Sequence, residues 1–555
     1  MTIADPPEKT SHAWPPPSAG LLSSLPERAG AQLIGLLENA AFVEALALAV
    51  QRNDLELAVD VMRVGWLDML KDDHRTQLRE ALETLGSRQL MAHPLLAMAL
   101  GLAYNGDGFR RSKAVHYFGL AAAGVRALPA RLSAAERALV LVSESAALRL
   151  VGQHTLAAKS ARVGVNVLDG IREERSSLIG FLPRVYSQLG TSLYYGGDEE
   201  EALRVFARGY AEAGATDLAS FTNLAMPAGI HALSGRLPEA RELVLMIRDE
   251  PWIDLQRRMY PGTFYRIAEA LLALERFDPS GAQQHLDAME HDRRSIEHWI
   301  AIAHVQALVR LVSGDAALGL AELEEYASLR NGDGDSRAIR ERLSSTRSLL
   351  HIALGNYTAA ERILHSDAGK RPQDHVDRAR LALATDRTGE ALKELRMIAG
   401  SPQSPRTHVE ALAIEAAAGL RTGRDRRTLA VVQQLIAMLR QTGQRIALQL
   451  VPPQDVEVLA EAIRSAGADD LVRLAPSHTL LVASDGPELT EREQAVLEAL
   501  ARSGSINRIA AELFVSSNTV KSHLKRLYRK LGARTRDEAL AAAFHHHLIS
   551  PAVDR

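Results

Sequence analysis

Apolar residues recur at helical spacing along most of the chain, and small or polar turns interrupt them at nearly regular intervals. Five of these turns contain a glycine: Gly152, Gly197, Gly235, Gly314 and Gly355. The separation is 38 residues from Gly197 to Gly235 and 41 from Gly314 to Gly355, within the ~34–45-residue period of two-helix repeats. This pattern predicts a solenoid of helical hairpins over residues 25–445, with an irregular all-α domain as the alternative.

The segment around Gly355 illustrates why such a chain would pair its helices. Glycine has no Cβ and adopts the left-handed conformation that ends a helix. Asn356 and Tyr357 turn the chain, and the small Ala359 and Ala360 let the next helix approach closely. Each hairpin leaves one apolar face uncovered, so neighbouring hairpins are expected to stack.

The pattern changes at Leu489, where the segments become shorter. Thr490, with Glu493 three residues later, forms a capping box, in which each residue bonds the backbone amide of the other at the start of a helix. After a Ser-Gly break, Ser505 is positioned to cap a second short helix, INRIAAELF. The sequence therefore predicts two short helices in close succession from about residue 490.

Two more short helices are expected before the chain ends. One runs from about Asn518 to Leu531 and ends at Gly532 as a left-handed cap, and Thr535 with Glu538 repeats the capping box for the other. Three residues connect the second and third helices. Four short helices with such a tight turn predict a helix-turn-helix module.

The third of these helices separates its apolar and basic residues. At ~100° per residue, four apolar residues fall within about 60° and are expected to face the core: Val520, Leu524, Leu527 and Leu531. Lys521, Lys525 and Arg529 lie within ~80° of one another on the opposite side, with Asn518 and Ser522 nearby. A helix of this kind fits the ~12 Å major groove of DNA, and its N-terminal half normally reaches base edges.

Composition supports a helical protein with one localised basic surface. The chain has 555 residues, 46% apolar and 24% charged, with a formal charge of −3. Residues 516–536 nevertheless hold seven Lys or Arg and no acidic residue, so the remainder sums to about −10. At about 150 residues per domain, the length predicts roughly three or four units.

Several functional classes are excluded or disfavoured. The chain contains no cysteine, which excludes disulfides, thiolate metal sites and cysteine nucleophiles. The N-terminus does not resemble a secretory signal, and no apolar run approaches the ~20 residues that span a bilayer. We therefore expect a cytoplasmic protein without a membrane partner. Residues 1–24 are expected to form a flexible Pro-rich segment before the repeats.

No catalytic or metal-binding constellation emerges from the sequence. The GxxxxGK[ST] phosphate loop, HExxH and GxSxG are all missing. His291, His298 and His304 are spaced so that they would not converge on one ion. The three consecutive histidines at 545–547 would point in different directions around a helix, so they are not expected to bind a metal ion together either. The sequence predicts a protein that is not an enzyme and that has no cofactor or metal.

The C-terminal motifs resemble a known family. LTxRE at 489–493, IAxxL at 509–513, TVKxH at 519–523 and KLG at 530–532 are similar to the LuxR-type DNA-binding domain of LuxR and NarL-like regulators, over about 55 positions. The resemblance implies that Lys521, Ser522 and Lys525 are the base-reading residues. It also implies dimerisation through the fourth helix, whose candidate residues are Thr535, Ala539, Leu540 and Ala543. This sequence departs from the family at Asn507, where other members often have a lysine. Because asparagine lacks the positive charge, Arg508 is the residue expected to make a phosphate contact there instead.

The remaining polar residues of this region are expected to contact phosphates or to cap the recognition helix. Hydroxyls, amides and cations all suit phosphate oxygens. The candidates are Ser516, Ser517, Asn518, Thr519, Arg526, Arg529, Lys530 and Arg534.

The repeats at 25–445 loosely resemble tetratricopeptide-type repeats in the sensor domains of MalT-like regulators.

Taken together, these patterns predict an all-α protein in which a helical-hairpin solenoid precedes a four-helix LuxR-type domain. The expected boundaries are 1–24, repeats at 25–445, a Pro/Gly-containing connector at 446–487, the DNA-binding domain at 488–549 and a tail at 550–555. The hypothesis is a transcription activator that binds double-stranded DNA as a homodimer and contacts RNA polymerase. Its repeats would bind a small-molecule or protein effector. The alternative is an interaction scaffold whose C-terminal domain contacts RNA polymerase or another protein.

Overall fold

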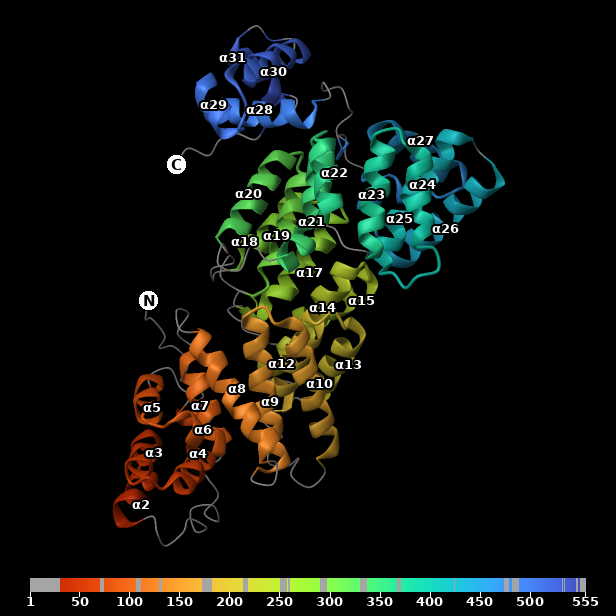
Figure 1. The fold of residues 1–555 in the computed structure, drawn as a ribbon. Helices are drawn as coiled ribbons and strands as arrows, with labels where there is room; N and C mark the ends of the chain where they lie inside the picture. The colour runs from red at the N-terminus through yellow and green to blue at the C-terminus, as the bar shows by residue number, and fades with distance from the viewer. Residues whose placement is uncertain are drawn as a thin grey trace, which may run out of the picture. The chain divides into compact units, whose positions relative to one another are not determined.

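A computed structural model describes residues 30–549, apart from 70–73, 106–110, 129–131, 172–181, 213–217, 250–256, 258–259, 290–296, 330–336, 367–370, 424, 474–478, 482–488, 532, 534 and 546–547. Within those ranges the backbone forms helices and turns and no strand, which confirms the all-α prediction (Figure 1). No helix of the described ranges is long and apolar enough to cross a bilayer. The chain divides into two compact units, residues 1–214 and 215–555.

Eleven helices of the first unit are described, and most of them pack against helices nearby in sequence, as in the pairs α7–α8, α9–α10 and α12–α13. They are α2 (Gly30–Glu38), α3 (Phe42–Gln51), α4 (Leu55–Met69), α5 (Arg75–Leu82), α6 (Ser87–Ala92), α7 (Pro94–Asn105), α8 (Arg111–Ala127), α9 (Ala134–Leu150), α10 (His154–Gly170), α12 (Leu182–Tyr195) and α13 (Glu199–Ala211).

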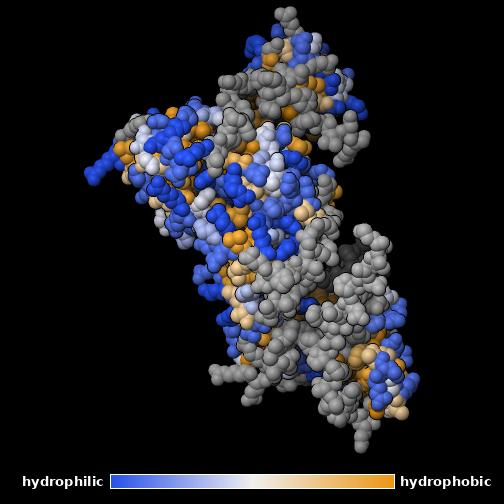
Figure 2. All heavy atoms as spheres, turned by 180° about the vertical axis from the view of Figure 1, so that it is seen from behind, coloured by the Kyte–Doolittle hydropathy of each residue, from blue (hydrophilic) through white to orange (hydrophobic). Residues whose placement is uncertain are grey.

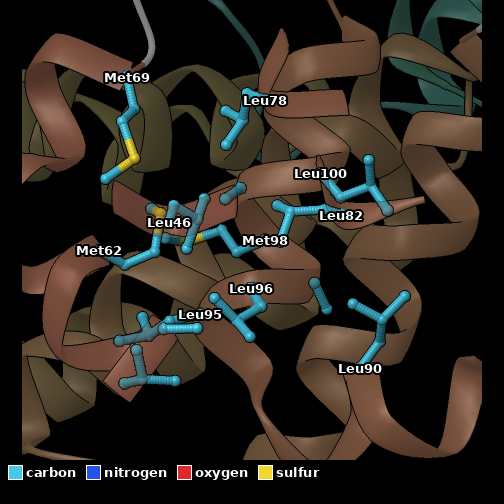
Figure 3. Close-up of a cluster of buried hydrophobic side chains, with 14 of the residues drawn as sticks. Leu46, Met62, Met69, Leu78, Leu82, Leu90, Leu95, Leu96, Met98 and Leu100 are labelled. Carbon is cyan, nitrogen blue, oxygen red and sulfur yellow. The ribbon is translucent and has the colours of Figure 1, made fainter. Parts of the chain in front are cut away.

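The N-terminal part of this unit has an apolar core that is rich in leucine and alanine. Figure 3 shows Leu46 of α3, Met62 of α4, Leu82 of α5 and Met98 of α7 converging on one cluster, and all four are at most 2% exposed. Full burial of such a side chain contributes roughly 1.5–3 kcal/mol. Packing of these short helices against one another therefore stabilises them more than helix propensity does.

The second unit continues the succession of helices. It contains α14 (Leu218–Ser234), α15 (Leu237–Asp249), η4 (Tyr260–Gly262), α17 (Thr263–Leu274), α18 (Pro279–Asp287), α19 (Trp299–Val312), α20 (Ala316–Ser328), α21 (Arg337–Ala353), α22 (Tyr357–Ser366), α23 (Pro372–Ala384), α24 (Thr388–Met397), α25 (Pro405–Thr422), α26 (Arg426–Thr442), η5 (Ile446–Gln449), α27 (Pro453–Ser465) and η6 (Asp469–Leu471). The first helix of each pair contacts the first helix of the next pair: α17 contacts α19, α19 contacts α21, α21 contacts α23, and α23 contacts α25.

A residue with left-handed backbone ends the first helix of successive pairs in both units. These residues are Gly152, Gly197, Gly235, Phe277, Gly314, Gly355 and Asp386, so the turns predicted from glycine are confirmed and two others use different residues. At Gly235 the amide of Arg236 donates to His231 O at 2.8 Å, which completes the left-handed helix cap. The hairpins are therefore observed, whereas their assembly into a regular solenoid stays a prediction.

Much of the predicted connector is folded. Residues 446–473 form η5, α27 and η6, and their apolar residues, including Leu448, Leu459 and Ile463, join the same buried cluster as α23–α26. Pro453, which suggested a break, occupies the first turn of α27, where a missing N–H costs nothing. Leu480 and Leu481, near the end of the predicted connector, are both buried.

Polar groups join parts of the second unit that lie far apart in sequence. Arg406 donates to the carbonyls of Ala232 and Leu233 at the end of α14 (3.0 Å each) and to Glu275 Oε1 at 3.2 Å. The amides of Arg445 and Ile446 donate to Glu275 Oε2 at 2.6 and 3.0 Å. We call this arrangement around Glu275 and Arg406 the clasp.

Close approach at the clasp depends on Gly235. A Cβ built there would lie 2.6 Å from Gln444 Nε2 and 2.7 Å from the Arg406 amide nitrogen. Gln444 Nε2 donates to Gly235 O at 3.2 Å. Glu275 is only 4% exposed, so the clasp is a buried polar contact between segments 131 to 209 residues apart.

A second buried polar network crosses the interior of the same unit. Arg380 is 1% exposed and donates to Asp377 Oδ1 (2.8 Å), Glu410 Oε2 (2.5 Å) and Leu450 O (3.1 Å). It thereby joins α23, α25 and the end of η5.

The surface of the protein is mainly polar. Figure 2 shows mostly hydrophilic residues, with apolar ones interspersed, on the face that it presents.

Candidate nucleic-acid interface

The four C-terminal helices, called the head below, are α28 (Glu491–Arg502), α29 (Ile506–Glu512), α30 (Ser517–Lys530) and α31 (Arg536–His545). They have an apolar core of their own, which includes Leu497, Ile509, Val520 and Leu527. The predicted helix-turn-helix arrangement is therefore present, and α28 and α29 both pack against α30.

The predicted capping box begins α28. Thr490 Oγ1 accepts from the Glu493 amide at 3.3 Å, and Glu493 Oε2 accepts from the Thr490 amide at 2.9 Å. Lys530 Nζ, from the end of α30, also donates to Glu493 Oε2 at 2.6 Å. Burial by itself raises the pKa of Glu493, but the hydrogen bonds from Lys530 and Thr490 outweigh it and lower this pKa below its ordinary value.

The turn between α29 and α30 is closed by backbone hydrogen bonds. The Val515 amide donates to Ala510 O at 3.0 Å, and Phe514 between them has a φ of 52°. Ser516 then caps α30, because its Oγ accepts from the Thr519 amide at 3.1 Å. Ser505 precedes α29 as expected, but its side chain makes no cap hydrogen bond, so that part of the prediction is wrong.

The two faces of α30 are separated as the angular analysis predicts. Val520, Leu524, Leu527 and Leu531 are buried. The residues exposed on the opposite side are Asn518, Lys521, Ser522, Lys525, Arg526 and Arg529. In the described part of the chain, none of the four cations has an ion-pair partner. The exposed face of α30 is therefore strongly basic.

The segment that contains this surface matches a known family. Residues 487–543 match the bacterial regulatory proteins of the luxR family. The probable transcriptional regulatory protein NarL of Mycobacterium tuberculosis is 48% identical over 63 residues, which are 11% of this chain and 29% of that protein. The spore germination protein GerE of Bacillus subtilis is 41% identical over 54 residues, 10% of this chain and 73% of GerE. The chain belongs to the LuxR family.

Membership rests on the head, because the match covers less than a third of the NarL relative. The same holds for the transcriptional regulatory protein YdfI of Bacillus subtilis, which is 43% identical over 63 residues, 11% of this chain and 30% of YdfI. The LuxR-family head is thus the shared part, and residues 1–486 lie outside the family match.

The structure places the predicted LuxR-family contact residues in three groups. Lys521, Ser522 and Lys525 are exposed on one face of α30, as a base-reading role requires, and Asn518, Arg526 and Arg529 border them. Ser516, Ser517 and Thr519 surround the start of α30, where Ser516 acts as the cap. Lys530 is turned toward Glu493 inside the head, and Arg534 lies outside the described residues, as does Gly532.

The fourth helix of the LuxR-family head uses two of its candidate dimerisation residues internally. Ala539 and Ala543 are fully buried in the head core, and Leu540 is half-buried against it. Thr535 Oγ1 accepts from the Glu538 amide at 3.2 Å at the start of α31. Dimerisation through this helix stays a prediction, with Ala539 and Ala543 serving the packing of α31.

Three supporting contacts were not expected from the sequence. Lys530 pairs with Glu493 across 37 residues, and Arg536 donates to Leu500 O at the end of α28 (2.9 Å). Asn507, at the position where the family often has lysine, accepts from Ser517 Oγ at 2.9 Å. Each of these contacts links residues on different helices, so it could not be predicted from a local sequence pattern.

The histidines considered as metal ligands do not form a site in the described ranges, which hold no cluster of three or more potential ligands. His298 is 2% exposed, and its ring stacks on Tyr260. The Nδ1 atom of His304 lies 2.8 Å from Thr346 Oγ1, and burial lowers the pKa of His304 to about 4. His291 lies outside the described residues.

Proposed function

We propose that this protein is a transcription regulator that binds double-stranded DNA through α30. The observation that carries the proposal is the exposed basic face of α30, whose Lys521, Lys525, Arg526 and Arg529 have no ion-pair partner among the described residues. A helix with such a face matches the width of the major groove. The relatives of the head include transcriptional regulatory proteins, which agrees with this role.

Within the interface we assign two kinds of contact. Lys521, Ser522 and Lys525 contact base edges, and each good contact contributes ~1–3 kcal/mol of discrimination. Arg526 and Arg529 lie further along the exposed face and neutralise phosphates. The cap Ser516 and the first amides of α30 suit phosphate oxygens as well.

The test measures DNA affinity and its salt dependence for purified variants. Lys521→Ala with Lys525→Ala is expected to weaken sequence preference, whereas Arg526→Ala or Arg529→Ala weakens binding to all DNA and lowers the salt slope by about 1. Arg464→Ala is the control, because it removes one cation from α27, where Arg464 is half-buried and paired with Glu457 and Glu461. Unchanged binding in all three α30 variants would contradict the proposal and favour a scaffold that contacts RNA polymerase or another protein.

We further propose that the repeats bind an effector, a small molecule or a protein, and control the head, and that the regulator activates transcription as a dimer in the cytoplasm. Support comes from the size of the helical region relative to the head and from the clasp, a polar contact of a kind that ligand binding can rearrange. Because the head has its own core, residues 485–555 can be compared with the full chain. Identical DNA binding and transcription output for both, under all conditions that induce the target genes, would contradict the sensor role.

A further inference from the structure

Phe514 combines two unfavourable features in the turn between α29 and α30. Its side chain is 95% exposed, more than any other exposed large apolar side chain in the described ranges, where Met397 follows with 66%. Its φ of 52° lies in the left-handed region, in which a Cβ is crowded and glycine is favoured. Neither the folding of the head nor its solubility explains a phenylalanine at this position.

Phe277 provides an internal comparison. It has nearly the same backbone conformation, with a φ of 56°, and also ends a helix before a hairpin turn. Phe277 is half-buried, however, and lines a groove of about 230 Å3 together with Leu448 and Val456. Packing offsets the strain at Phe277, whereas no packing among the described residues offsets it at Phe514, which is 95% exposed.

The position of Phe514 indicates what its ring contacts. Only Val515 separates it from Ser516, the cap of α30. Ser517 Oγ donates to Asn507 Oδ1, which holds the starts of α29 and α30 together beside the turn. Phe514 therefore adjoins the N-terminal end of the proposed interface, where phosphates and their sugars would lie.

We propose that Phe514 packs against the sugar–phosphate backbone of bound DNA, where its ring covers deoxyribose carbons at the edge of the groove that α30 enters. The inference rests on the proposed function. An apolar ring releases no counterions, so its contribution is independent of salt, unlike that of a lysine or arginine. It is also independent of sequence, because every nucleotide presents the same sugar.

The experiment uses the full chain and a mixed-sequence DNA duplex, with affinity measured over a series of salt concentrations. Phe514→Gly is expected to weaken binding about five-fold at every salt concentration, with an unchanged slope, because a partly covered aromatic surface is lost. Since glycine relieves the left-handed strain, the melting temperature of the variant is expected to equal or exceed that of the parent. Phe514→Asn, which also tolerates this conformation, is expected to behave in the same way.

Phe277→Gly is the control, expected to lower stability without a change in DNA affinity. Parental affinity in both Phe514 variants would overturn the inference, even if transcription falls, since that result would assign the ring to a protein partner. A change in the salt slope would overturn it too. If the parent itself binds no DNA, the proposed function fails; if the parent binds and the Phe514 variants match it, only this inference fails.

Discussion

Replacement of Glu275 by alanine tests whether the clasp holds the second unit together. The carboxylate accepts hydrogen bonds from Arg406 and from the amides of Arg445 and Ile446, and it is 4% exposed. Glu275→Ala leaves two amides without an acceptor and a largely buried guanidinium without its counter-charge. Loss of one partner of a buried pair costs about 3–5 kcal/mol, and unsatisfied buried amides fall in the same range.

Hydrogen exchange is the appropriate assay, because a chain with several cores does not unfold in one step. With a cost of about 4 kcal/mol, the amides of Arg445 and Ile446 are expected to exchange roughly a thousandfold faster. Glu275→Gln is expected to have a smaller effect, since the amide oxygen can still accept from both backbone N–H groups.

The matched control is Glu322→Ala. Glu322 also pairs with an arginine, Arg310 at 2.7 Å, but both side chains are about a quarter exposed, and such pairs contribute ~0–1 kcal/mol. Wild-type protection of residues 445–446 in Glu275→Ala would refute the role of the clasp. Equal effects of Glu275→Ala and Glu322→Ala would refute the argument from burial.

Three further predictions concern stability. Leu527→Ala is expected to destabilise the head by about 2–5 kcal/mol, measured by thermal unfolding, whereas Lys525→Ala changes it by less than about 0.5 kcal/mol. Glu493→Gln is expected to destabilise the head at neutral pH; because the folded pKa of Glu493 is lowered, this difference disappears as pH falls through that pKa. His304 has a folded pKa of about 4 against 6.5, so the unfolded chain protonates first and stability falls from pH 6.5 to 4, by up to about 1.4 kcal/mol per pH unit; His304→Gln is expected to reduce this slope in urea titrations.

Clear outcomes would contradict each of these. A Leu527→Ala head as stable as the Lys525→Ala head would show that the core assignment of α30 is wrong. A Glu493→Gln penalty that stays constant down to pH 3 would exclude the capping carboxylate as its source. An unchanged pH slope in His304→Gln would mean that other groups dominate acid sensitivity.

The head could be predicted closely because its determinants are local. The capping box of Thr490 and Glu493 spans three residues, and the division of α30 into buried and exposed faces follows from helical spacing. Such patterns depend only on residues that are close in sequence, so they can be recognised without knowledge of the tertiary structure. The same holds for the glycine turns of the hairpins.

The rest depends on contacts between distant residues. Nothing around Glu275 or Arg406 indicates that they meet, since 131 residues separate them. Residues 446–473 were expected to be a joint because prolines and glycines suggest loops, yet Leu459 and Ile463 pack into the cluster of α23–α26. Phe514 was likewise taken as part of a short apolar helix, and only the structure places it in an exposed turn.

Charge pairing explains how a nearly neutral chain carries a strongly basic face. In the repeats, several arginines pair with acidic residues from other segments, as Arg162 of α10 does with Asp198, the N-cap of α13, and Arg248 of α15 does with Glu269 of α17. The cations of α30 have no such neighbours in the described ranges, and the basic Lys530 that does pair is the one facing the core. The net charge of −3 therefore averages paired and unpaired groups. Because unpaired charge governs the attraction of a polyanion, the exposed cations of α30 account for the DNA attraction that we propose.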